Sequence, residues 1–336
     1  MDYRRLGKSG LIVSAVGLGT MNFGSQVDQA TSHRILDRAV EAGVTFIDTA
    51  ESYASPPSPE TSGKSEDFIG SWLKGKPRDR VVIATKISGP VDGMFSVTKH
   101  LRGGTAVVDP HHIVRAVETS LKRLGTDYID LYQTHWPERV VPVEVQLEAF
   151  QRLIAAGKIR YIGTSNETPW GLTRLVTTAE NRSLPRPVSV QNLFNLIQRG
   201  FERGLAEVCR EESVGFIAYS PLAMGLLSGK YAEGKLPQGS RLQSFERYRK
   251  SHGQAGMIES ANAYVALARE AGLDPAVMAL AWVRSHRDVT SVLSSCSSMA
   301  QVETMLAGAD LTLGPDLLAR VEELRDEFEP PWSRLG

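Results

Sequence analysis

Four side chains that can handle protons stand at corresponding places along this sequence. Asp48, Tyr53, Lys86 and His135 each lie at, or shortly after, the end of a short apolar run. In a closed barrel of parallel strands, residues at the carboxyl ends of the strands converge on one face. A carboxylate, a phenol, an ammonium group and an imidazole that meet there would form a site able to donate a proton to a substrate.

The elements that must position these residues follow a regular alternation of short β-rich runs and longer helical patterns. Eight strands are predicted, at residues 15–18, 45–48, 80–86, 128–134, 159–164, 188–191, 215–219 and 289–293. Helical patterns occupy residues 29–42, 65–74, 110–124, 142–156, 169–178, 201–212, 258–285 and 300–307. This alternation favours a parallel sheet, and eight units favour closure. We therefore predict an α/β fold, a (β/α)8 TIM barrel, as a single domain over residues 1–336.

Local signals support the predicted helix ends. Asp109 and Pro110 are typical of an N-cap followed by proline at the first helical position. Glycines follow several predicted helices, where a left-handed residue commonly ends a helix, at Gly43, Gly75, Gly125 and Gly157. Residues 3–13 alternate and contain a turn signal, so we expect an N-terminal β-hairpin that plugs the floor of the barrel.

Three segments are too long to be plain connections between elements. They span residues 52–63, 88–108 and 220–254, and each follows a predicted strand. We therefore expect long loops on the C-terminal face, where they would shape a substrate pocket. The alternative is that they are tolerated insertions without a function.

Composition limits the classes of partner. Lys and Arg together number 38, as do Asp and Glu, so the formal net charge is zero. This balance argues against a nucleic-acid-binding or polybasic membrane-binding protein. The two cysteines cannot form a disulfide framework, and no apolar stretch approaches the ~18 residues of a membrane span. No long apolar segment follows the N-terminus, so we expect no secretory signal and a cytoplasmic protein.

Several motifs, in order along the chain, resemble those of one known family. They are Tyr3-Arg4-Arg5-Leu6-Gly7, Phe46-Ile47-Asp48-Thr49-Ala50-Glu51-Ser52-Tyr53, Thr85-Lys86, Tyr128-Ile129-Asp130-Leu131-Tyr132, His135-Trp136-Pro137, Gly157-Lys158-Ile159-Arg160-Tyr161-Ile162-Gly163-Thr164-Ser165-Asn166 and Ala218-Tyr219-Ser220-Pro221-Leu222. The chain is similar over nearly its whole length to the aldo-keto reductase superfamily, and within it to the bacterial Tas-type reductases. The resemblance implies an NADP-dependent oxidoreductase that reduces aldehydes or ketones to alcohols, with NADPH bound outside a Rossmann fold.

The resemblance also assigns roles to the four residues. It implies that Tyr53 is the general acid, and a free tyrosine has a pKa near 10. Lys86 would be the cation that lowers this pKa, and Asp48 would pair with Lys86. His135 would donate a hydrogen bond to the substrate oxygen. No metal ligand set is predicted.

Further residues resemble the family's cofactor contacts. Ser165, Asn166 and Gln191 would hold the nicotinamide carboxamide, Tyr219 would stack on the ring, and Lys230 and Arg241 would reach the phosphates. The complete predicted set is Thr20, Met21, Asp48, Ser165, Asn166, Gln191, Tyr219, Ser220, Pro221, Leu222, Met224, Lys230, Arg241, Ser295, Ser297 and Gln301.

The sequence leaves four points open. The family usually has glycine where Ser295 stands, and no lysine or arginine stands near Ser297, so NADH is an alternative to NADPH. Some relatives of this barrel are cofactor-bound regulatory subunits of ion channels, so a redox-sensing module without significant turnover is an alternative function. The four catalytic candidates serve reduction and alcohol oxidation alike. Neither the carbonyl or alcohol substrate nor the oligomeric state follows from the sequence.

Overall fold

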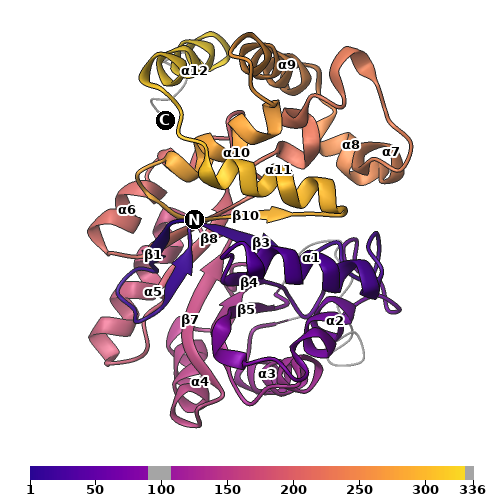
Figure 1. The fold of residues 1–336 in the computed structure, drawn as a ribbon. Helices are drawn as coiled ribbons and strands as arrows, with labels where there is room; N and C mark the ends of the chain where they lie inside the picture. The colour runs from indigo at the N-terminus through magenta and orange to yellow at the C-terminus, as the bar shows by residue number, and fades with distance from the viewer. Residues whose placement is uncertain (90–106, 330–336) are drawn as a thin grey trace.

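The chain folds into a closed barrel of eight parallel strands, surrounded by helices (Figure 1). The structure is a computed structural model that describes residues 1–89 and 107–329. Around the barrel the strands follow the order β10-β3-β4-β5-β6-β7-β8-β9, and β10 pairs with both β9 and β3 to close the ring. The predicted fold class is confirmed.

The barrel strands begin and end within a few residues of the predicted positions. They are β3 (Val16–Gly19), β4 (Phe46–Asp48), β5 (Val82–Ile87), β6 (Ile129–Thr134), β7 (Ile159–Ser165), β8 (Ser189–Leu193), β9 (Gly215–Tyr219) and β10 (Val289–Ser295). Most of their residues are buried, because one face of each strand fills the barrel and the other packs against helices.

Helices surround the barrel, and most of them lie at predicted helical patterns, whereas the helices over residues 241–244, 246–252 and 315–328 were not predicted. In the first half of the chain they are α1 (Gln29–Glu41), α2 (Lys64–Leu73), α3 (Pro110–Leu124), α4 (Val143–Ala155) and α5 (Pro169–Arg182). In the second half they are α6 (Leu205–Glu211), α7 (Arg241–Ser244), α8 (Glu246–His252), α9 (Ala255–Glu270), α10 (Pro275–Ser285), α11 (Met299–Asp310) and α12 (Pro315–Phe328). Short 3-10 helices lie at η1 (Arg78–Arg80), η3 (Gly200–Glu202), η4 (Ala223–Ser228) and η5 (Ala232–Gly234).

The prediction of one long helical segment over residues 258–285 was wrong. The chain forms α9 and α10 there, separated by a turn in which Gly272 has a φ of 70°. Asp274 begins α10 as its N-cap, and its carboxylate accepts hydrogen bonds from the backbone N–H groups of Ala276 and Val277. Because Pro275 has no N–H to continue the preceding helix, the chain starts a new one.

The predicted caps are present elsewhere. Asp109 begins α3 and accepts a hydrogen bond from the backbone N–H of His112. The four glycines predicted to follow helices all have positive φ angles, from 61° to 91°: Gly43, Gly75, Gly125 and Gly157.

The N-terminal hairpin closes the floor of the barrel, as predicted. It consists of β1 (Tyr3–Arg5) and β2 (Ile12–Ser14), paired antiparallel. Leu6, Leu11 and Val13 pack against side chains that fill the barrel interior, among them Phe46 and Ile217. The floor is therefore sealed, and the open end of the barrel is the one at which the strands finish.

Two of the three long segments lie at this open end. The chain after β4 continues to α2, and the chain after β9 forms η4, η5, α7 and α8 before it enters α9. In Figure 1, α7 and α8 project beyond the end of the barrel. The third predicted loop, residues 88–108, lies mostly outside the described residues. Among the helices described, none is long and apolar enough to cross a membrane.

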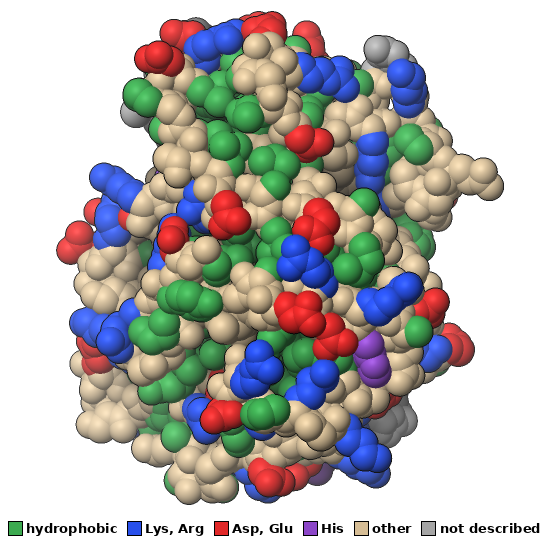
Figure 2. Space-filling model, viewed as in Figure 1, with side chains coloured by type: hydrophobic (Ala, Val, Ile, Leu, Met, Phe, Trp, Pro, Cys, Tyr) green, Lys and Arg blue, Asp and Glu red, His purple; other side chains and the backbone are tan. Residues whose placement is uncertain are grey.

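The outer surface carries charges of both signs. On the face drawn in Figure 2, Lys and Arg side chains are interspersed with Asp and Glu side chains, and apolar side chains lie between them. Several of these charges form ion pairs between neighbouring helices, such as Arg38 of α1 with Glu303 of α11.

Candidate active site

A cavity of about 620 Å³ opens at the carboxyl ends of the strands. Every residue predicted to contact the cofactor lines it, and so do Tyr53 and His135. Lys86 does not line the cavity; it is fully buried beneath it, where it bonds to Asp48. The fold thus brings all the predicted site residues to one place, although they span the chain from Thr20 to Gln301.

Asp48 and Lys86 form a buried ion pair between adjacent strands. Asp48 ends β4, Lys86 lies in β5, and their side chains are 3% and 0% exposed. Lys86 Nζ donates to Asp48 Oδ1 at 2.5 Å and to the backbone oxygen of Thr49 at 2.8 Å. Burial lowers the pKa of Lys86, and the charges of Asp48 and then Glu66 oppose that effect.

Tyr53 and His135 lie over this pair. Lys86 Nζ is 5.0 Å from the centre of the Tyr53 ring, and the rings of Tyr53 and His135 meet edge to face, with centres 5.6 Å apart. The His135 ring also stacks against Trp136. A phenol and an imidazole therefore face the cavity together, above a buried ammonium group.

The pKa of Tyr53 is shifted in the direction opposite to the one expected from Lys86. Burial raises this pKa, the carboxylate of Asp48 and then Tyr248 raise it further, and Arg241 opposes them. The net shift is therefore upward, and a contribution of Lys86 in the opposite direction stays a prediction. Burial is the largest cause, because it disfavours the charged phenolate, and the Lys86 ammonium group is itself paired with Asp48.

The environment of His135 favours its neutral form. Burial lowers the pKa of His135 well below its usual value, and the nearby charge of Lys86 lowers it further. A neutral imidazole has one N–H donor and one acceptor nitrogen. His135 can therefore offer a hydrogen bond to a substrate oxygen without carrying a charge.

The second oxygen of Asp48 is held by two glutamines. Its Oδ2 accepts from Gln191 Nε2 at 2.8 Å and from Gln133 Nε2 at 3.2 Å. Gln133 is a residue that sequence reasoning missed. A signal for it existed: Gln133 precedes His135 by two positions, so the strand period puts a polar side chain on the same face of an apolar strand.

Ser165, Asn166 and Tyr219 are linked to one another and to nearby backbone. Asn166 donates to the backbone oxygen of His135 at 2.9 Å and to Ser165 Oγ at 3.2 Å. Tyr219 OH donates to Asn166 Oδ1 at 2.7 Å, and Ser165 Oγ donates to the backbone oxygen of Gln191 at 2.7 Å. The donors of Ser165 and Asn166 are thus already engaged, so a ligand carboxamide would have to compete for them.

The turn after β9 has a strained backbone. Ser220 and Met224 have φ angles of 55° and 57°, values that residues other than glycine rarely adopt. Both line the cavity, together with Pro221 and Leu222 between them. Such strain is commonly found at ligand-binding sites, where the surrounding structure maintains it.

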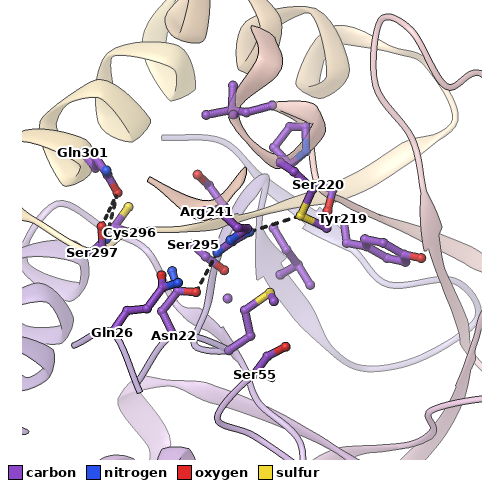
Figure 3. Close-up of a pocket in the computed structure, with 18 of the residues that line it drawn as sticks. Asn22, Gln26, Ser55, Tyr219, Ser220, Arg241, Ser295, Cys296, Ser297 and Gln301 are labelled. Carbon is purple, nitrogen blue, oxygen red and sulfur yellow. Dashed lines mark hydrogen bonds between the residues drawn. The ribbon is translucent and has the colours of Figure 1, made fainter. Parts of the chain in front are cut away.

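Two cations of the η4–α7 region line the cavity. Arg241 reaches across it, as Figure 3 shows, and its Nη2 donates to Asn22 Oδ1 at 2.7 Å. Its Nη1 lies 3.3 Å from the sulfur of Met224. Lys230 lies against the ring of Tyr231. Asn22 was not predicted, and no local signal identifies it, since its partner is 219 positions away.

The segment after β10 forms a polar end of the cavity. Ser297 donates from its backbone N–H and its hydroxyl to Gln301 Oε1, at 2.8 and 3.1 Å (Figure 3). Ser298 caps the start of α11. Burial raises the pKa of the Cys296 thiol to about 12, so this cysteine is a weak nucleophile. Ser295 lies beside Gly19, where an added Cβ would come within 2.8 Å of Ser295 Oγ.

No metal centre is evident in the part of the chain that the structure describes, since no three or more His, Cys, Asp or Glu side chains are grouped to hold an ion. His112, which follows His111 at the start of α3, lies instead near the buried carboxylate of Glu51, at 3.6 Å.

Comparison with known proteins identifies relatives over almost the full length of the chain. The model of the Aldo/keto reductase family matches residues 15–326. The chain is 42% identical to Protein tas of Escherichia coli (strain K12), over 98% of this chain and 99% of that protein. It is 31% identical to a probable voltage-gated potassium channel subunit beta of Oryza sativa subsp. japonica, over 96% of each. It is 30% identical to L-glyceraldehyde 3-phosphate reductase of Escherichia coli (strain K12), over 96% of this chain and 92% of that protein.

Proposed function

The chain belongs to the aldo/keto reductase family, and on that basis we propose that it is an NAD(P)H-dependent oxidoreductase that reduces aldehydes or ketones to alcohols, reversibly. The observation that carries the proposal is the arrangement of four side chains at the cavity. A buried Asp48–Lys86 pair lies beneath the rings of Tyr53 and His135. The name of one relative, L-glyceraldehyde 3-phosphate reductase, supports carbonyl reduction as the class of reaction.

Tyr53 is the proton donor in this proposal. The raised pKa keeps its phenol protonated at neutral pH, which a general acid requires before it can transfer a proton. The alkoxide that forms as a carbonyl is reduced is a far stronger base than a carboxylate or an imidazole. A weakly acidic phenol can therefore still protonate it.

His135 and the ion pair have supporting roles. The neutral imidazole of His135 donates to the carbonyl oxygen and stabilises the negative charge that develops there. Lys86 places a positive charge near the phenol ring, so it stabilises the phenolate that remains after proton transfer. Asp48 holds Lys86 in that position.

The lining residues fit a nicotinamide dinucleotide, which when bound supplies the hydride. Gln191 directs its donor nitrogen to Asp48, and no described residue donates to its carbonyl oxygen, which is therefore an acceptor for a ligand amide. Tyr219 presents an aromatic ring at the cavity wall, and Arg241 and Lys230 are cations suited to phosphates. A volume of about 620 Å³ is within the usual range for cofactor sites.

NADPH is the proposed cofactor, and NADH is the alternative. Arg241 and Lys230 are the cations among the described lining residues, and the Ser297–Gln301 end of the cavity has hydroxyl and amide groups instead. Dissociation constants for both nucleotides, measured by quenching of tryptophan fluorescence, decide between them. Tighter binding of NADPH by at least about tenfold supports the proposal, and equal or tighter binding of NADH contradicts it.

The activity is tested with Tyr53→Phe. We expect loss of about 10²- to 10⁴-fold in kcat, the range for removing a general acid, with the nucleotide dissociation constant unchanged. Tyr161→Phe is the matched control, because its hydroxyl accepts from the backbone of Gly10 in the hairpin, at the opposite end of the barrel. Full activity in Tyr53→Phe would refute the role of this residue.

A second candidate function is a cofactor-bound redox sensor that does not turn over. It is motivated by the relatives named as potassium channel subunits beta, at 31% and 30% identity. A panel of aldehydes and ketones, tested with NADPH and with NADH, separates the two. Bound nucleotide without oxidation by any carbonyl favours the sensor.

A further inference from the structure

Gln133 lies inside the barrel, next to the ion pair. It is fully buried in β6, and in the strand register it sits between Lys86 of β5 and Gly163 of β7. A Cβ on Gly163 would come within 3.2 Å of Gln133 Cγ and 2.5 Å of Ser189 Oγ. The absence of a side chain at Gly163 therefore leaves the space in which the Gln133 side chain lies.

The hydrogen bonds of Gln133 determine which way its amide points. A carboxylate can only accept, so the amide nitrogens of both Gln133 and Gln191 must face Asp48 Oδ2. Gln191 Nε2 also lies 3.3 Å from Gln133 Oε1, so Gln133 accepts from the same amide that it helps to hold. The two glutamines and Asp48 thus form a closed set of three hydrogen bonds, contributed by β4, β6 and β8.

We propose that Gln133 is a positioning residue of the active site. It holds the carboxylate of Asp48 toward Lys86, and it holds the amide nitrogen of Gln191 toward Asp48, so that the carbonyl oxygen of Gln191 remains available to a ligand in the cavity. The effect of Gln133 on catalysis rests on the proposed function. Gln133 does not line the cavity, so it acts through Asp48 and Gln191 and not by contact with a ligand.

The charge balance around Asp48 explains why the amide matters. A buried carboxylate needs hydrogen bonds to both oxygens, and Lys86 satisfies only Oδ1. The other ionisable groups nearby are Tyr53 and His135 above the pair and Glu66 of α2, which acts on Lys86 from outside the barrel. If Gln191 turns toward a ligand, Gln133 still donates to Oδ2, so this oxygen keeps a hydrogen-bond partner.

The first test replaces the amide with an apolar group. We expect Gln133→Leu to lower kcat at least about tenfold, because a charge-assisted hydrogen bond is lost, while KM for the carbonyl changes less than about threefold. Gln146→Leu is the matched control. Gln146 is also a buried glutamine, but its amide donates to the backbone oxygen of Val141, just before α4, and Gln146 does not line the cavity. Thermal unfolding of both variants separates loss of folding from loss of function.

The second test uses the protonation of a carboxyl group at position 133. In Gln133→Glu, the ionised side chain cannot donate to Asp48, whereas the protonated side chain has an O–H that can. Because two adjacent carboxylates favour protonation of one of them, activity relative to the wild type should recover as the pH is lowered from 8 to 6. A merely structural role for Gln133 predicts no such recovery, and Gln146→Glu should show none.

A third measurement does not depend on turnover. In protein labelled with ε-¹³C lysine, the NMR signal of Lys86 is assigned by its absence in Lys86→Met. The added carboxylate of Gln133→Glu should raise the pKa of Lys86, and Gln146→Glu should leave it unchanged.

The outcomes separate the two proposals. If the wild type reduces no carbonyl, the proposed function fails, and the NMR titration alone decides whether Gln133 acts on the ion pair. If the wild type and Gln146→Leu are active, and Gln133→Leu has the same kcat and pH profile as they do, the role of Gln133 is overturned while the function stands. An unshifted Lys86 signal in Gln133→Glu also overturns it.

Discussion

The imidazole of His135 determines how the candidate site responds to acid. Its pKa is held well below the usual value of 6.5 by burial and by Lys86. The neutral form, which can donate one hydrogen bond and stays uncharged beside Lys86, therefore persists to lower pH than it would on the protein surface. The protonation state of this residue follows from its surroundings, and its chemistry as a donor follows from the protonation state.

We predict that protonation of His135 does not limit activity between pH 8 and pH 6.5. Because the folded pKa is lowered, the loss of the neutral form begins only below the usual value, and kcat/KM should show no titration centred near 6.5. A pH profile of kcat/KM with a saturating nucleotide measures this. A decline centred near pH 6.5 that disappears in His135→Asn would contradict the prediction.

At the scale of elements, the hairpin of β1 and β2 is the feature on which the barrel floor depends. Gly7 forms the corner of this hairpin with a φ of 55°. A Cβ at this position would lie 2.3 Å from the backbone oxygen of Val188 and 2.8 Å from the backbone nitrogen of Gly215. Those atoms stand at the beginnings of β8 and β9, so they cannot move without disturbing the strands that carry Gln191 and Tyr219.

We predict that Gly7→Ala destabilises the protein far more than Gly75→Ala. Both glycines have positive φ angles, 55° and 79°, so each alanine costs about 1–2 kcal/mol of backbone strain. Of the two, only Gly7 has atoms close to an added Cβ, because a Cβ at Gly75 would have no neighbour within 4 Å. Overpacking should add about 1–3 kcal/mol at Gly7, which urea unfolding measures. An equal loss of unfolding free energy in the two variants would contradict the prediction and show that the hairpin shifts to make room for the added Cβ.

At the scale of the whole molecule, a cluster of charges joins the C-terminal helix to the barrel. Glu202 of η3 pairs with Arg199 at 2.8 Å and with Arg325 of α12 at 2.6 Å, and it lies 3.5 Å from His286. Burial alone would raise the pKa of Glu202, but hydrogen bonds from His286 and Arg199 outweigh that effect and lower the pKa to about 2.

We predict that this cluster contributes stability that is lost in acid. The folded pKa of Glu202 is depressed below the usual 4.5, so the contribution is complete above pH 4.5 and falls as the pH approaches 2. The shift corresponds to about 3 kcal/mol in the free energy of unfolding. Glu202→Gln should therefore differ most from the wild type at pH 7 and little at pH 2.5 in urea unfolding. Glu303→Gln, in an exposed pair with Arg38, should cost less than about 1 kcal/mol at either pH.

The sequence by itself determined the order and type of the barrel strands and of most helices, and the general location of the site. The strands of apolar residues, the caps at Asp109 and the glycines after helices are signals carried by neighbouring residues. Asp48 and His135 could be assigned to strand ends for the same reason. Many of the residues that line the cavity could be anticipated because their motifs are continuous segments, although their assigned roles remain proposals.

Only the tertiary structure decided how these groups affect one another. The bond between Arg241 and Asn22 joins positions 219 residues apart, and the contacts of Gln133 and Gln191 with Asp48 depend on the register of strands β4, β6 and β8. The direction of the pKa shift of Tyr53 depends on its burial, on the charge of Asp48, and on Tyr248 and Arg241, which lie far away in the sequence. Periodicity and capping act over a few residues, whereas desolvation and charge depend on everything that surrounds a side chain once the chain has folded.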